Sequence, residues 1–207
     1  MSLHLFMLRH ARTAWNDTGR IQGQTDIPLS APGLAQARAW RLPGELRPTA
    51  FWCSDLSRAR VTATLLRGAS STPLRSDARL REMNWGDWTG DTLTALRQRL
   101  GQAFKAQEDR GLDLQPPAGE TPRHVRARLR AWLCEQPATG RIAVVTHKGI
   151  LRAALSLATG WDYRGKPPSK AAHGLGHWFT WDAAARRLTV RALDVALMPA
   201  VSSGDNA

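Results

Sequence analysis

A short apolar run near the N-terminus constrains the fold of this chain more than any other stretch. The run from Leu3 to Leu8 has the length of a strand and is too short for an independent helix. Arg9, His10 and Arg12 follow it at once. Open α/β sheets bind ligands at the carboxyl ends of their strands. We therefore expect His10 to lie in such a crevice, flanked by two guanidiniums that keep their charge.

The residue types around His10 favour the binding of a phosphoryl group. Two neighbouring cations lower the pKa of an imidazole, so the ring stays neutral and nucleophilic. The same cations attract a dianionic phosphoryl group toward that ring. An Arg-His pair alone is a weak signal, since a histidine packed at a strand end beside surface arginines is the more common case. Evidence from other stretches of the chain is needed to distinguish a phosphoryl-binding site from a packed histidine.

Segments with the pattern of strands and helices alternate along the rest of the chain. We expect further strands at 50–53, 142–145, 177–180 and 188–192, with a short one beginning at Leu74. We expect helices at 30–39, 56–67, 92–105, 121–135 and 150–158. This alternation predicts a three-layer α/β/α sandwich with a mostly parallel central sheet. We expect one domain over residues 1–207, with a frayed polar tail at about 202–207.

Composition narrows the class of protein. The chain has 207 residues, of which 43% are hydrophobic, as in an ordinary globular domain. Its net charge is +12, but the arginines are scattered, so no dedicated nucleic-acid site is evident. Cys53 and Cys134 lie in apolar contexts, imply no disulfide framework and fit a reducing compartment. The first apolar run is too short for a signal peptide and no stretch approaches membrane-spanning length, so we expect a cytoplasmic protein without a membrane partner.

Two further strand exits carry residues suited to phosphate. The strand at 142–145 ends at Thr146 and His147, and the helix that follows offers free N–H groups to an anion. Arg58 lies one turn into the helix after the strand at 50–53. Adjacent parallel strands would bring His10 and His147 into one crevice. Three strands are thus expected to end at one sheet edge with residues suited to phosphate. This favours a single site over three independent surface features.

Phosphoryl transfer also needs a proton donor for the leaving group. Glu82 is the best candidate, because it lies on a loop shaped by glycines and hemmed by Trp85 and Trp88. A glutamate on a loop is usually solvated, so it is the context that makes Glu82 a candidate.

Six blocks of sequence resemble those of the histidine phosphatases, branch 1 of the phosphoglycerate mutase-like superfamily. In the family's opening motif an arginine and the nucleophilic histidine lead, and an asparagine follows six places after that histidine, as Asn16 does here. The blocks occur in the family's order from residue 3 to about 152, at 9–16, 22–37, 54–63, 80–90, 119–128 and 144–152. Blocks in this order are highly specific, whereas any single block is not.

The resemblance implies a mechanism as well as a fold. It implies that His10 attacks phosphorus in line and forms a phosphohistidine. It implies that Glu82 protonates the leaving oxygen and then, as a carboxylate, activates the water that hydrolyses the intermediate. Arg9, Arg58 and His147 would hold the equatorial oxygens. No metal and no cofactor are implied, because these cations already neutralise the charge.

The resemblance also implies residues that bind substrate. Asn16, Gln22 and Gly23 would touch the phosphate or the group beside it. Arg12 stands where an acidic or amide residue is frequent and adds positive charge at the mouth. Lys148 stands where glycine or alanine is usual. If Lys148 points inward it would bind a second anionic group, and a solvated lysine at a helix start is the equal alternative.

Hydrolysis is favoured over phosphoryl transfer between metabolites. Family mutases acting on phosphoglycerate carry a long basic insertion with paired arginines, whereas residues 91–115 hold only separated cations. We therefore expect a phosphomonoester hydrolase that acts on a small phosphorylated metabolite. The alternatives are a mutase, a protein phosphohistidine phosphatase and a basic binding scaffold without activity. The phosphohistidine phosphatase would want an open, shallow site, while residues 93–115 predict a lid.

Two other kinds of chemistry are disfavoured. A cysteine phosphatase needs an arginine six places after its cysteine, and neither cysteine has one. His173 and His177 are four residues apart, but Gly174 and Gly176 would interrupt the helix that could align them on a metal. We therefore expect no metal site.

Overall fold

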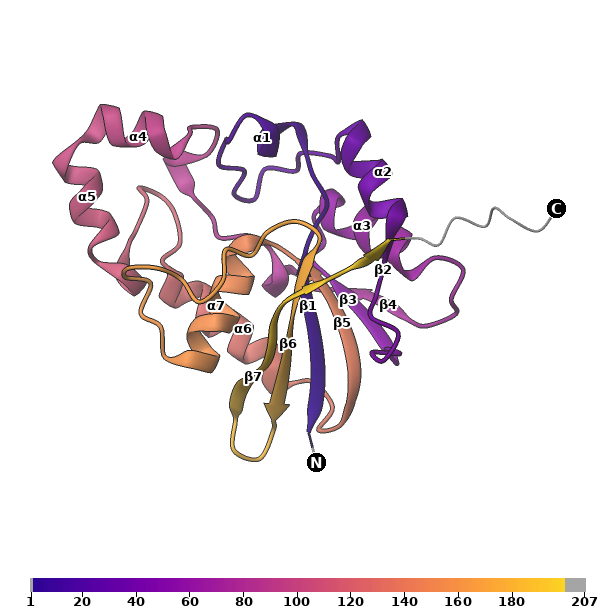
Figure 1. The fold of residues 1–207 in the computed structure, drawn as a ribbon. Coiled ribbons are helices and arrows are strands. Elements are labelled where there is room, and N and C mark those ends of the chain that lie inside the picture. The colour runs from indigo at the N-terminus through magenta and orange to yellow at the C-terminus, as the bar shows by residue number, and fades with distance from the viewer. Residues whose placement is uncertain (1, 200–207) are drawn as a thin grey trace.

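A six-stranded, mostly parallel sheet forms the centre of residues 2–199, the part of the chain that this computed structural model describes (Figure 1). The strand order is β4-β3-β5-β1-β6-β7. The parallel strands are β1 (Leu3–Arg9), β3 (Ala50–Cys53), β4 (Leu74–Ser76) and β5 (Gly140–Thr146). The antiparallel strands β6 (Leu175–Asp182) and β7 (Arg187–Ala196) extend the sheet beyond β1. The predicted α/β architecture is confirmed.

Helices cover both faces of this sheet and enclose two cores. Helices α2 (Ala31–Ala39) and α3 (Ser57–Arg67) pack on one face, and α6 (Pro122–Cys134) and α7 (Lys148–Thr159) pack on the other (Figure 1). Side chains of a strand alternate between its two faces. In β1, Leu3, Leu5 and Met7 enter the core under α6 and α7, while Phe6 and Leu8 enter the core under α2 and α3. The molecule is therefore the three-layer sandwich that the alternation of segments predicts.

The remaining elements are short. They are α1 (Ala14–Asp17), α4 (Leu93–Leu100), α5 (Gln102–Glu108), the 3₁₀ helices η1 (Ala78–Leu80), η2 (Gly86–Trp88) and η3 (Gly111–Asp113), and the paired strands β2 (Trp40–Arg41) and β8 (Met198–Pro199). Figure 1 shows α1 beyond the carboxyl end of β1, and α4 and α5 standing away from the sheet. Of these elements, α1 therefore lies at the end of the sheet where the histidines are expected.

The single helix expected over residues 92–105 is wrong. Two helices, α4 and α5, meet at Gly101, which adopts a left-handed conformation with φ of 50°. Leu96 and Phe104 both pack against Trp88, so the apolar pattern continues across the break and conceals it.

Two further expectations concern the chain as a whole. Among residues 2–199, no helix has both the length and the apolar composition needed to cross a membrane. The frayed tail expected at 202–207 lies outside the described residues.

Candidate active site

The register of two parallel strands brings two histidines together. Arg9 at the end of β1 lies opposite Thr146 at the end of β5, so the residues that follow are also neighbours. The backbone N–H of His10 donates to the carbonyl of Thr146 over 2.9 Å. The ring centroids of His10 and His147 are 5.1 Å apart. Two of the three predicted strand exits thus meet directly.

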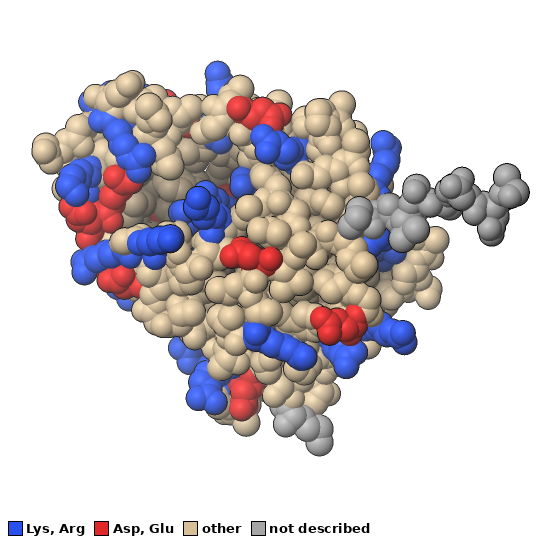
Figure 2. Space-filling view, in the orientation of Figure 1, with Lys and Arg blue, Asp and Glu red and all other residues tan. Residues whose placement is uncertain are grey.

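A cavity of about 340 Å³ lies against His10. Nine of the ten residues predicted for the site line it: Arg9, His10, Arg12, Asn16, Gln22, Gly23, Arg58, Glu82 and Lys148. The tenth, His147, is fully buried beside His10. Figure 2 shows the molecule hollowed beside the α4 and α5 region, with both Lys or Arg and Asp or Glu side chains around the opening. The structure therefore gathers all ten residues around one cationic cavity.

Hydrogen bonding fixes the tautomer of His10. Its Nδ1 lies 2.7 Å from the carbonyl oxygen of Ala11, and a carbonyl can only accept, so Nδ1 carries the proton. The lone pair therefore lies on Nε2. The pKa of His10 is well below its ordinary value, first because the ring is buried and then because Arg9 and Arg58 lie nearby. The prediction attributed a neutral ring to Arg9 and Arg12, whereas burial lowers this pKa most and Arg58, not Arg12, acts beside Arg9.

His147 has the opposite proton arrangement. Its Nδ1 accepts from Nε of Arg58 over 3.4 Å, which leaves the proton on Nε2. Burial, then Arg58 and His10, hold the pKa of His147 well below its ordinary value. Within residues 2–199 its Nε2 is buried and has no hydrogen-bond partner. Since buried polar groups are rarely left unpaired, an acceptor on a ligand would satisfy this donor.

Arg58 links His147 to the loop that carries Gln22 and Gly23. It is fully buried on the first turn of α3. Its Nη1 and Nη2 each donate over 2.7 Å, to the carbonyls of Thr25 and Gly23. Asp26 accepts from the backbone N–H of Ser57 over 2.8 Å, which ties the same loop to α3. The third strand exit therefore holds the cavity wall in place.

Other polar atoms facing this region also lack partners within the described chain. Arg9 Nε, Gln22 Oε1 and Arg152 Nε are buried and unpaired, and all three residues line the cavity. Burial lowers the pKa of Arg9 to about 10, so the guanidinium stays charged at neutral pH. A bound anion would supply acceptors to the two arginines.

Two backbone N–H groups, one next to Glu82 in the chain and one at the start of α7, hold the carboxylate of Glu82. Its Oε1 accepts from the N–H of Met83 over 2.8 Å and from the N–H of Gly149 over 2.9 Å. A helix N-terminus favours a carboxylate at this point. A Cβ at position 149 would lie 2.1 Å from Oε1, so the contact requires glycine. Oε2 takes no part in these contacts.

An ion pair between Arg128 of α6 and Glu120, which precedes that helix, supports the backbone of Glu82. Arg128 and Glu120 pair over 3.0 Å, and Nη2 of Arg128 also donates to the carbonyl of Glu82 over 3.1 Å. Glu120 accepts from the backbone N–H of Asn84 over 2.8 Å. The block at 119–128, one of the six that resemble the family, therefore holds the loop that carries Glu82.

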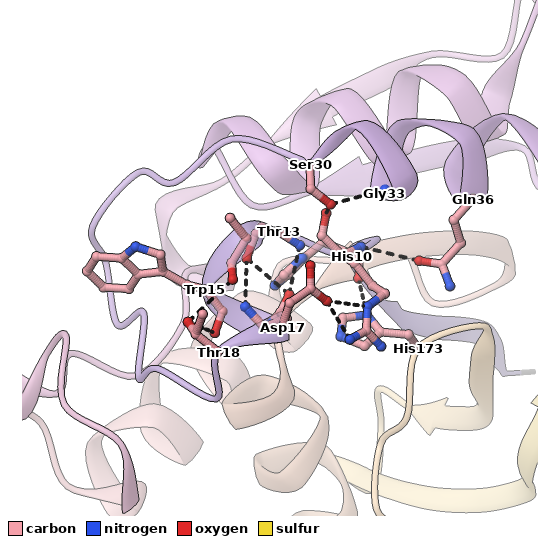
Figure 3. Close-up of polar contacts among 12 residues, drawn as sticks. His10, Thr13, Trp15, Asp17, Thr18, Ser30, Gly33, Gln36 and His173 are labelled. Carbon is pink, nitrogen blue, oxygen red and sulfur yellow. Dashed lines mark hydrogen bonds and ion pairs between the residues drawn. The ribbon is translucent and has the colours of Figure 1, made fainter. Parts of the chain in front are cut away.

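Arg12 and Asn16 line the cavity, yet their side chains are engaged locally. Arg12 pairs with Asp17 over 2.5 Å at the surface. Asn16 Oδ1 accepts from the backbone N–H of Thr13 over 3.0 Å, in a capping box that begins α1 (Figure 3). Arg12 thus forms an exposed ion pair at the mouth, and the amide nitrogen of Asn16 stays outside the capping contact.

Sequence reasoning missed His173. Its Nδ1–H donates to the carbonyl of His10 over 2.9 Å, and the two rings meet edge to face with centroids 5.9 Å apart (Figure 3). Burial, followed by Arg9, lowers the pKa of His173 to about 4, so the ring is neutral. The only signal in the sequence was its spacing from His177, which pointed to a metal.

Arg152 was also missed. It lies one turn after Lys148 on α7 and lines the same cavity. In the sequence it is the last residue of the block at 144–152, and no role was predicted for it.

Comparisons with known proteins identify the family of this chain. Residues 5–190 match the family model of the histidine phosphatase superfamily (branch 1). The probable phosphoglycerate mutase GpmB of Klebsiella pneumoniae subsp. pneumoniae is 33% identical over 165 residues, covering 76% of this chain and 75% of that protein.

Solved structures give the same result. YhfR of Bacillus stearothermophilus superposes with a TM-score of 0.78 at 27% identity, covering 94% of this chain and 98% of that one. A mycobacterial glucosyl-3-phosphoglycerate phosphatase in complex with VO3 superposes with a TM-score of 0.74 at 27% identity, covering 93% and 99%. As its sequence blocks predicted, the chain belongs to the histidine phosphatase superfamily (branch 1) and is an enzyme of that superfamily.

Proposed function

We propose that this protein hydrolyses phosphomonoesters of small metabolites through a phosphohistidine on His10. The observation that carries the proposal is the state of the His10 ring. It is neutral, its tautomer leaves the lone pair on Nε2, and it borders a cavity lined by arginines with unpaired donors. A neutral imidazole can attack phosphorus, and those donors suit the phosphoryl oxygens.

In the first step Nε2 of His10 attacks phosphorus from the side opposite the ester oxygen. The N–P bond forms, the P–O bond to the alcohol breaks, and Glu82 gives its proton to the departing oxygen. Arg9, Arg58 and the Nε2–H of His147 hold the equatorial oxygens, where charge develops. The unpaired Nε atoms of Arg9 and His147 are the support for this assignment.

In the second step water hydrolyses the phosphohistidine. Glu82, now a carboxylate, takes a proton from the water as its oxygen bonds to phosphorus. The N–P bond breaks, His10 regains its neutral ring and inorganic phosphate leaves. The backbone contacts of Glu82 Oε1 keep the carboxylate beside the cavity through both steps. This scheme needs no metal, because the arginines and His147 supply the positive charge and the donors.

Local ion pairs favour hydrolysis over a mutase reaction. Within residues 91–115, Arg97 pairs with Glu108 over 2.6 Å and Arg99 with Asp91 over 2.5 Å. These cations are therefore engaged within their own segment and are less free to hold a second phosphorylated substrate. The named relatives include both a probable mutase and a phosphatase, so this distinction rests on the chain's own residues.

Phosphate release from p-nitrophenyl phosphate and benzyl phosphate tests the function, with His10→Ala as the inactive control. We expect wild-type turnover of both, no change with EDTA, and no turnover by the variant. Glu82→Gln should slow benzyl phosphate far more than p-nitrophenyl phosphate, because p-nitrophenolate leaves without protonation. Activity that survives His10→Ala, or that EDTA removes and zinc or magnesium restores, would contradict the proposal.

A further inference from the structure

A second cavity of about 300 Å³ adjoins the catalytic one. The two share Trp85, Leu93, Gly149 and Arg152 as wall residues. The second cavity lies among the α4–η3 segment, the start of α6 and the loop that follows α7. Its apolar walls include Met83, Trp85, Leu93, Phe104, Leu114 and Trp161. A compartment of this kind suits an apolar ring next to the phosphoryl site.

Two residues that line this second cavity each carry a buried polar atom with no hydrogen-bond partner among residues 2–199. These atoms are Nε of Arg152 and the hydroxyl of Tyr163. Burial raises the pKa of Tyr163, so its hydroxyl keeps its proton and can donate. Native proteins rarely leave such groups unpaired, which indicates that a ligand supplies the acceptor.

The positive charge of Arg152 is also uncompensated. Within residues 2–199, neither Arg152 nor Lys148 forms an ion pair. The two residues are one turn apart on α7 and therefore share a face of that helix. Glu82 raises the pKa of both residues, but its Oε1 is already held by backbone N–H groups. Glu108, the carboxylate on the wall of the second cavity, is paired with Arg97. A buried guanidinium without a counter-ion is costly unless a ligand brings one.

The backbone at Tyr163 adds independent support. Its φ of 72° lies in the left-handed region, which an aromatic residue rarely adopts. The ring stacks on Trp161 with centroids 4.5 Å apart, and Trp161 Nε1 donates to the carbonyl of Arg164 over 2.8 Å. Arg164 Nε donates to the carbonyl of Asp109 over 2.9 Å, which ties this loop to the end of α5. Strain that the surroundings maintain in this way is found mainly at functional positions.

We propose that the second cavity binds the alcohol portion of the substrate, and that this portion carries an apolar ring and a second anionic group. Arg152 and the hydroxyl of Tyr163 would hold that anionic group, with Lys148 adding positive charge from the adjoining catalytic cavity, while Trp85, Phe104 and Trp161 enclose the ring. The inference rests on the proposed function, since the phosphoryl group is taken to occupy the catalytic cavity. Carboxylate and phosphonate share the required chemistry, and both are included in the test.

Calorimetric binding of non-hydrolysable benzylphosphonates separates this inference from the catalytic proposal. The probes are benzylphosphonates bearing a carboxylate, a neutral carboxamide or a second phosphonate, each in the 3- and 4-ring positions. We expect wild type to bind at least one anionic probe about tenfold more tightly than the carboxamide of the same shape. A carboxylate that outranks the phosphonate, or the reverse, identifies which anion the site prefers.

Variants of the second cavity supply the controls. The preference is the ratio of the affinity for the anionic probe to that for the carboxamide. Arg152→Leu should lower this ratio to about one, and Arg152→Lys should keep part of the wild-type ratio. Tyr163→Phe should lower it about threefold. Arg130→Leu removes an exposed cation that lines neither cavity and should leave the preference unchanged. Tyr163→Phe deletes one oxygen, so it keeps the test valid if Arg152→Leu fails to fold.

Equal binding of anionic and carboxamide probes by wild type would overturn the inference, as would an unchanged preference in folded Arg152→Leu. Turnover of benzyl phosphate is read separately. Hydrolysis without any anion preference refutes the second site alone, whereas anion preference without hydrolysis refutes the proposed function and leaves the second site supported.

Discussion

The two imidazoles at the sheet edge carry their protons on different nitrogens. His10 donates from Nδ1 to Ala11, whereas His147 accepts at Nδ1 from Arg58. A lone pair on one ring and an N–H on the other are what nucleophilic attack and oxygen binding require. His173 holds the backbone of His10 by donating a hydrogen bond to its carbonyl.

Stability should depend on pH through these buried histidines. The pKa values of His10, His147, His173 and His177 are all lowered, so the unfolded chain binds more protons below its ordinary histidine pKa of 6.5. The free energy of unfolding should therefore fall from about pH 7 to pH 5, by up to about 1.4 kcal/mol per pH unit for each histidine. Ion-paired carboxylates lose their contribution only at more acidic pH.

Urea unfolding across this pH range measures the effect. His173→Gln should make the fall shallower, because one shifted group is removed. A free energy of unfolding that is flat or rises as the pH falls would contradict the burial of neutral rings.

Gly149 should be needed for catalysis more than for folding. Gly149→Ala would bring a Cβ to 2.1 Å from Oε1 of Glu82 and displace the carboxylate. We expect kcat for benzyl phosphate to fall about 10- to 100-fold, with a much smaller loss on p-nitrophenyl phosphate. Gly44→Ala is the matched control, because nothing lies within 4 Å of its Cβ. Equal losses for both substrates would argue against the donor role of Glu82.

At the scale of elements, the sequence predicted those features that depend on a local pattern of residues. It did not predict those that depend on pairing between distant strands. The apolar runs that became β1 and β5, and the residues at their ends, could be read from the sequence because both signals are local. His173 could not, because it reaches His10 only through the antiparallel pairing of Leu8 with Gly176. Arg152 was missed because an arginine without a partner is recognised only when burial is known.

The support that α6 gives to the Glu82 loop should be measurable. In a double-mutant cycle, Arg128→Met and Glu120→Gln should show a coupling of about 1–3 kcal/mol in the free energy of unfolding. Arg123, on the same helix, forms an exposed ion pair with Asp113, and the coupling in that pair should be much smaller. Similar couplings for both pairs would mean that the Arg128 network is an ordinary surface contact.

For the whole molecule, the net positive charge should increase the rate at which anionic substrates bind. The net charge of +12 and the cations around the opening attract dianionic phosphates over distances set by the Debye length. Raising the ionic strength from about 0.01 M to 0.5 M should lower kcat/KM several-fold while changing kcat little. Steady-state kinetics at constant pH checks this, with an uncharged osmolyte as control. A salt-independent kcat/KM would show that steering plays no part.

The most direct measurement is capture of the phosphorylated intermediate. Wild type, quenched in alkali during turnover of p-nitrophenyl phosphate, should yield one acid-labile phosphoryl group on the peptide that contains His10. Glu82→Gln should retain more of it than wild type, because water is no longer activated. A label on any other residue, or rapid hydrolysis with no labelled protein in either form, would contradict attack by His10.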